Sequence, residues 1–229
     1  MVIESSERGL AWRESGWLVV IEFALVVAIY LGRQHHILKV SATPYLLLLA
    51  WISLRLRRIP WKQIGFMRYH SWARTLLLGI FYGLGLELFD LFAKQPLLTR
   101  LFRKPPDLSS FSAVRGNLKF ALAMIALIWL LAAFGEELVY RGYLMNRVAD
   151  LGRGTRTAWI LSLFVISALF GLSHYQQGLT GVIEEGSDGL ILGFMYLAYR
   201  RNLAIPIVAH GVCDTIDIAL LFFGKYPGL

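Results

Sequence analysis

The chain has 229 residues, of which 57% are hydrophobic and 17% charged, and its mean hydropathy is +0.58. Few soluble domains have this composition, and the length leaves room for roughly six to eight membrane spans of about 20 residues but not for a sizeable soluble domain. The net charge of +8 does not indicate a nucleic-acid partner, because Lys and Arg lie between apolar segments. We therefore expect a single transmembrane domain, residues 1–229, in a lipid bilayer.

The first half of the chain predicts three membrane spans. Residues 15–31 are apolar except for Glu22, and we expect them to stay as a span because no small-residue cleavage site follows. Residues 40–54 form a shorter Leu-rich span, and residues 75–93 form the third. Small residues in this third span would let another helix approach closely: Gly79, Gly83 and Gly85.

Two basic segments separate these spans from each other and from the second half of the chain. Residues 55–74 interleave six Lys or Arg with Trp, which is typical of a segment at the headgroup level, and we expect it in the cytoplasm. Residues 94–117 contain Pro, Lys and Arg and predict a polar connection.

The second half predicts four more helices. They are expected at 118–149, 157–173, 189–199 and 203–223, separated by a turn at 150–156, an acidic patch at 184–188 and Arg200-Arg201. Alternating the sides places the basic segments 55–74, 150–156 and 200–201 together, with the amino terminus inside and the acidic patch opposite. The expected fold is therefore all-α and polytopic, with about seven transmembrane helices around a polar intramembrane cavity.

Ionisable side chains inside the predicted spans indicate a functional site, because burying charge in a membrane is costly. The first cluster is Glu136-Glu137 with Arg141. Residues four apart share a helix face, so Glu137 can pair with Arg141 as a positioning group, while Glu136 is free to accept a proton from water. A charged cluster that reaches the surface at the helix end would explain these residues equally well.

Two further clusters repeat this four-residue spacing. Phe170 and His174 lie at the end of one span, and His210 and Asp214 lie in another, where the Asp can orient the His. A carboxylate and two imidazoles on separate helices predict hydrolysis, with His210 as a donor to the oxyanion.

Two ways of activating the water stay open at this point. Glu136, His174 and His210 can bind a divalent metal, with zinc as the expected ion, or Glu136 and His174 can act on water with no cofactor. A Cys213–His210 nucleophile is disfavoured, because nothing in the sequence would acidify that thiol.

Together the three motifs, Glu136-Glu137-x-x-x-Arg141, Phe170-x-x-x-His174 and His210-x-x-x-Asp214, resemble the signature of the CPBP family. This family comprises CAAX prenyl endopeptidases of the Ras-converting type and bacterial Abi or bacteriocin-processing relatives, and the resemblance covers about residues 118–223. It implies that Glu136 and His174 are the catalytic pair acting on water. It also implies that His210 and Asp214 stabilise the transition state or help to hold a metal, although many relatives have Asn in place of Asp214.

The resulting hypothesis is an intramembrane protease that cleaves a membrane-associated protein or peptide. We expect it in the cytoplasmic membrane of a bacterium, and the sequence gives no oligomeric state. The main alternative is a noncatalytic scaffold or bacteriocin-immunity-type protein that retains the fold. A transporter would also explain buried Glu, His and Asp, but the sequence has no evident internal repeat.

Overall fold

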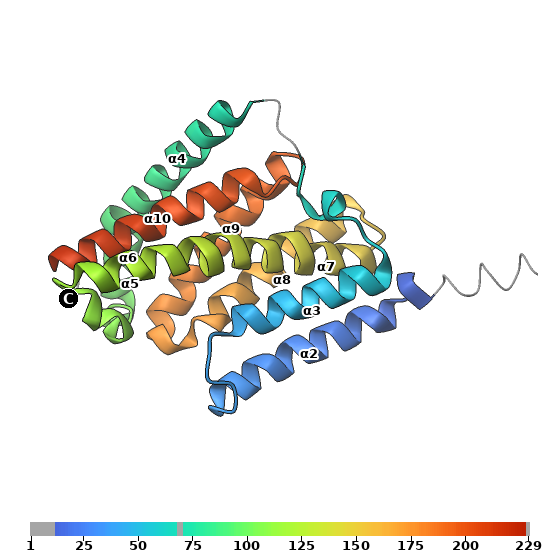
Figure 1. Cartoon of the computed structure of the whole chain (residues 1–229), viewed down its shortest axis with the longest axis horizontal. Helices are drawn as coiled ribbons and strands as arrows, with labels where there is room; N and C mark the ends of the chain where they lie inside the picture. The colour runs from blue at the N-terminus through green and yellow to red at the C-terminus, as the bar shows by residue number, and fades with distance from the viewer. Residues whose placement is uncertain (1–11, 68–70, 228–229) are drawn as a thin grey trace, which may run out of the picture.

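The computed structural model describes residues 12–67 and 71–227, and in this part of the chain all regular structure is helical (Figure 1). The α-helices are α2 (Gly16–Gln34), α3 (Ala42–Arg57), α4 (Trp72–Phe89), α5 (Gln95–Phe102), α6 (Leu118–Leu127), α7 (Met145–Leu151), α8 (Arg156–Ser173), α9 (Gly178–Ala198) and α10 (Ala204–Phe223). The predicted inward amino terminus lies outside the described residues, as do residues 68–70 of the basic segment.

Five of the described helical segments are long and apolar enough to cross a membrane. They are Gly16–Gln34, Trp72–Phe102, Leu118–Leu151, Arg156–Ser173 and Ala204–Phe223. This confirms an all-α polytopic membrane protein, but the predicted number of seven spans is not exact. Helices α3 and α9 were also predicted to hold spans but are not among these five. Helix α3 has only 16 residues, and α9 carries three acidic residues.

Hydroxyl and amide side chains mark where several helices begin. Ser15, Ser71, Asn117 and Thr155 each accept a hydrogen bond from a backbone N–H of the first turn that follows. These N–H groups have no partner inside the helix, so the caps fix the starts of α2, α4, α6 and α8.

The predicted connection at 94–117 is wrong in its first part, because the helix that begins at Trp72 continues to Phe102. A π-helical turn, Asp90–Lys94, joins α4 to α5, and Pro96 lies in the first turn of α5. Lys94 is buried and makes ion pairs with Asp90, at 2.6 Å, and with Asp188. The charge that suggested a solvated loop is thus neutralised inside the protein.

The acidic patch at 184–188 is also not a connection between helices. Glu184 and Asp188 lie within α9, which begins at Gly178 and packs against α5 and α8. Parts of two basic segments predicted on one side do meet, because residues 59–67 and 200–201 line a common cavity at one end of the bundle. The third segment, 150–156, contributes only Asp150 to this cavity, and the rest of the lining comes from Asn146 and Arg147 of α7.

Helices α4 and α10 lie against each other along much of their length (Figure 1). A methyl group added at Gly79 would lie 2.5 Å from Cβ of Val208, and one added at Gly83 would lie 2.6 Å from the carbonyl oxygen of Ala209. Both distances are too short for a real contact, so the predicted close approach is correct at these two glycines. The same prediction is wrong at Gly85, where nothing lies within 4 Å.

These glycines give a matched pair of stability predictions. Gly83→Ala is expected to destabilise the protein by about 1–3 kcal/mol, because α10 must move to admit the methyl group. Gly85→Ala should be neutral or stabilising by up to about 1 kcal/mol, because Ala favours the helix and meets open space. Thermal unfolding of both variants in one detergent checks this, and equal melting temperatures would contradict the packing of α4 on α10.

Candidate active site

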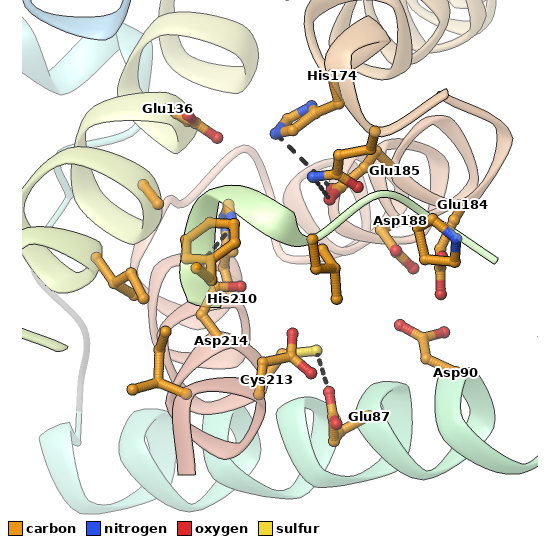
Figure 2. Close-up of a pocket in the computed structure, with 18 of the residues that line it drawn as sticks. Glu87, Asp90, Glu136, His174, Glu184, Glu185, Asp188, His210, Cys213 and Asp214 are labelled. Carbon is orange, nitrogen blue, oxygen red and sulfur yellow. Dashed lines mark hydrogen bonds and ion pairs between the residues drawn. The ribbon is translucent and has the colours of Figure 1, made fainter. Parts of the chain in front are cut away.

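A cavity of about 410 Å³ opens between α4, the long helix 118–151, α8, α9 and α10 (Figure 2). Four of the sequence-predicted site residues line it: Glu136, His174, His210 and Asp214. They come from three different helices, as the three motifs predicted. Glu137 and Arg141 are not among the lining residues, and they lie fully buried behind the cavity wall.

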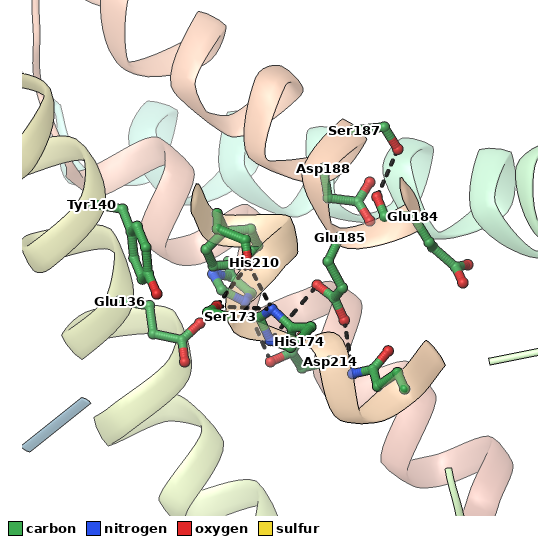
Figure 3. Close-up of polar contacts among 12 residues, drawn as sticks. Glu136, Tyr140, Ser173, His174, Glu184, Glu185, Ser187, Asp188, His210 and Asp214 are labelled. Carbon is green, nitrogen blue, oxygen red and sulfur yellow. Dashed lines mark hydrogen bonds and ion pairs between the residues drawn. The ribbon is translucent and has the colours of Figure 1, made fainter. Parts of the chain in front are cut away.

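Glu136 projects from a π-helical stretch, Ile128–Leu144, in the middle of the long helix. Its side chain is partly exposed, and Oε1 accepts a hydrogen bond from Thr43 Oγ1 at 3.3 Å. Figures 2 and 3 show its carboxylate directed towards His174 across the cavity. π-Helical stretches are frequent at functional sites. The carboxylate is therefore placed where it can contact a water molecule and a substrate.

His174 caps the carboxyl end of α8, and its ring orientation is fixed by the backbone. Nδ1 lies 3.0 Å from the carbonyl oxygen of Phe170, which can only accept, so Nδ1 carries the proton. In the neutral ring Nε2 is then the acceptor, and it lies 4.0 Å from Oε2 of Glu185 (Figure 3). The Phe170 ring packs edge-on against the imidazole, with centroids 4.9 Å apart. The predicted pairing of Phe170 and His174 thus presents a basic nitrogen near the cavity.

His210 is held between two carboxylates from different helices. Nδ1 lies 3.0 Å from Oε1 of Glu137, and Nε2 lies 3.5 Å from Oδ2 of Asp214. The sequence predicted the Asp214 contact, whereas the shorter contact to Glu137 could not be read from spacing. An ionised carboxylate only accepts, so the contact with Glu137 directs the Nδ1 proton and leaves Nε2 for the cavity side.

Glu137 and Arg141 form the predicted pair on the long helix. Arg141 donates to Oε1 of Glu137 at 2.6 Å and to the carbonyl oxygen of Gly189 at 3.2 Å, and its guanidinium lies 4.7 Å from the centre of the Phe170 ring. The Arg141 side chain is only 2% exposed and the Glu137 side chain is fully buried. They therefore join the long helix to α8, α9 and α10, and through His210 they position the cavity wall.

Sequence reasoning missed a second group of acidic residues in this cavity. Glu185 lies beside His174, and the far part of the cavity is lined by further carboxylates: Glu87, Asp90, Glu184, Asp188 and Asp217. Glu87 and Asp90 were visible inside an apolar span, but nothing in the sequence linked them to α9. Cys213 donates to Oε2 of Glu87 at 2.9 Å. A carboxylate neighbour opposes formation of a thiolate, which argues against a Cys nucleophile.

The predicted metal ligands do not form a ready ligand set. Among the residues that the structure describes, no group of three or more His, Cys, Asp or Glu side chains is arranged to hold a metal ion. His210 has a carboxylate at each ring nitrogen. Both ways of activating water, with zinc or another divalent ion at Glu136, His174 and His210 or by Glu136 and His174 alone, therefore stay predictions.

Residues 118–216 match the family described as type II CAAX prenyl endopeptidase Rce1-like. No curated protein and no solved structure matches the chain. The family match contains all three motifs and confirms the resemblance that the motifs indicated. Residues 118–216 are therefore similar to the Rce1-like family of CAAX proteases, and the apolar helices make the chain an integral membrane protein.

Proposed function

We propose that the protein is an intramembrane endopeptidase that hydrolyses a peptide bond of a membrane-associated protein or peptide. One observation carries the proposal: Glu136, His174, His210 and Asp214, from three apolar helices, line a single cavity. The Rce1-like match supports the same class of reaction. We place the protein in the cytoplasmic membrane of a bacterium, as the resemblance to bacterial relatives implies.

Glu136 acts as the general base in this proposal. Its carboxylate takes one proton from water, while Nε2 of His174 accepts a hydrogen bond from the other O–H and orients the oxygen towards the scissile carbonyl carbon. After the C–O bond forms, the protonated Glu136 gives its proton to the leaving amine as the C–N bond breaks. For this transfer, a carboxylate oxygen of Glu136 must lie about 2.6–3.2 Å from the water oxygen in the complex with substrate.

His210 stabilises the negative charge that develops on the carbonyl oxygen. Its Nδ1–H is held by Glu137, and Asp214 lies beside Nε2. With a carboxylate beside each ring nitrogen, His210 acts in this proposal as the imidazolium, which carries a proton on both nitrogens, and its Nε2–H group donates to the oxyanion. Such a donor is most effective in a cavity that is shielded from water. Glu137 and Arg141 act as positioning residues, because they reach the reacting atoms only through His210 and Phe170.

The most direct test compares membrane peptides in cells that produce the wild-type protein or the Glu136→Gln variant. An uncut precursor should accumulate with the variant, and its cleaved product should be absent. A noncatalytic scaffold would give the same peptides in both cells. If a cellular phenotype survives Glu136→Gln and His174→Ala at normal protein abundance, the proposed activity is not its cause, and the scaffold function is favoured.

Metal dependence gives a separate prediction. Because the described side chains form no cluster suited to a metal, hydrolysis by the purified protein should be unchanged after treatment with a chelator and dialysis. Metal content per protein, measured in the same samples, shows whether the treatment was complete. Loss of activity on chelation, restored by zinc, would show that substrate or a conformational change assembles Glu136, His174 and His210 into a metal site.

A further inference from the structure

A second cavity of about 530 Å³ lies at the end of the bundle where residues 59–67, α7 and Arg200-Arg201 meet. It is bounded by the short helix Trp61–Ile64, by α7, and by the turn between α9 and α10. Its lining shares no residue with the candidate active site. The cavity is therefore a separate feature of the fold.

The charge of this second cavity is strongly positive. Four basic side chains line it, Lys62, Arg147, Arg200 and Arg201, against one acidic side chain, Asp150. Asp150 is already paired with Arg147 at 2.9 Å. In the described part of the chain, no carboxylate forms an ion pair with the other three basic residues. The lining thus has three positive charges that form no ion pair with any carboxylate of residues 12–67 and 71–227.

Arg147 differs from the arginines of the α9–α10 turn in its burial, because it is only 4% exposed. Its Nε–H group is buried and has no hydrogen-bond partner among the described residues. The nearby Arg57 is different, since Glu22 accepts from it at 2.8 and 3.0 Å. A buried donor without a partner is costly, so the described residues leave the hydrogen-bonding capacity of this cavity-lining arginine incompletely used.

The two arginines of the α9–α10 turn are held in an unusual backbone conformation. Arg200 and Arg201 have φ angles of 57° and 60°, in the left-handed region that few residues other than glycine adopt. The turn is fixed by a hydrogen bond from the N–H of Arg201 to the carbonyl oxygen of Tyr196, at 2.7 Å. The Arg201 guanidinium stacks 5.0 Å from the centre of the Trp159 ring. The fold thus presents two adjacent cations at a defined place.

We propose that this cavity binds a phosphate group, and that the group belongs to the headgroup of an anionic phospholipid. Helices end or begin around it, at Arg57, Leu151, Ala198 and Ala204. Because spanning helices end near the membrane surface, we expect the cavity at the depth of the headgroups rather than of the acyl chains. Basic cavities between transmembrane helices are suited to anionic headgroups, and Arg binds phosphate through paired N–H donors. The proposal does not depend on proteolytic activity.

The test measures thermal stabilisation of the full-length protein in mixed micelles as a function of added lipid. Phosphatidylglycerol should raise the melting temperature, and phosphatidylcholine, whose headgroup has no net charge, should not. The Arg200→Gln/Arg201→Gln variant should need roughly 25-fold more phosphatidylglycerol for half of the effect, because each basic residue contributes about fivefold.

The control variant is Arg153→Gln/Arg156→Gln, which removes the same charge from exposed positions near this end of the bundle but outside the cavity lining. It should respond to lipid as the wild type does. An equal loss of response in both double variants would overturn the site, because general surface charge would then explain the binding. Stabilisation by inorganic phosphate alone, with no response to phosphatidylglycerol, would overturn the assignment to a lipid.

Discussion

Replacing Glu136 by Gln is expected to lower the rate of peptide-bond hydrolysis by about 10²–10⁴-fold. The amide has nearly the same size and can still accept from Thr43, but it cannot take a proton from water. Only the chemical step should suffer, so kcat falls while KM changes little. The measurement is the initial rate of cleavage of a membrane-associated peptide by protein purified in detergent.

The matched control is Asp107→Asn, which makes the same change at an exposed carboxylate outside the cavity and should leave the rate unchanged. The Glu136→Gln/His174→Ala double variant adds a sharper criterion. If both groups act on one water molecule, the double variant should be little slower than the slower single variant. Losses that multiply would contradict this shared role, and a Glu136→Gln rate close to that of the wild type would refute the general base.

The sequence was sufficient to predict the all-α fold and the three helices that carry the motifs. Each helix has a long apolar run. His174 lies at the end of one such run, and His210 and Asp214 lie inside another. Their shared cavity follows from the cost of exposing these groups to lipid. The π-helical stretch around Glu136 was not predictable, because nothing in the apolar pattern distinguishes it from an α-helix.

The errors at 94–117 and 184–188 have one physical cause. Lys94 and Asp188 each look like solvated residues when only their neighbours in the chain are considered. In the fold they neutralise each other across 94 positions of sequence, so both remain inside helices. Glu22 and Arg57 do the same between α2 and α3. Such long-range pairs cannot be read from local composition.

Replacing Arg141 by Leu is expected to destabilise the protein by about 3–5 kcal/mol, because it leaves the buried Glu137 carboxylate without its cation. The change also removes the hydrogen bond to Gly189 that joins the long helix to α9. Unfolding of the purified protein by SDS in mixed micelles measures the loss. Arg156→Leu, at an exposed position in the first turn of α8, should stay within about 0.5 kcal/mol of the wild type.

The Glu137→Leu/Arg141→Leu double variant separates stability from positioning. Removing both charges takes away the unpaired carboxylate, so the double variant should be more stable than Arg141→Leu alone. Hydrolysis should nevertheless stay low, because Nδ1 of His210 has lost its acceptor and the ring is no longer oriented. Recovery of both stability and kcat would contradict the positioning role of Glu137. A double variant that is less stable than Arg141→Leu would show instead that the contact between Glu137 and His210 is the dominant buried interaction.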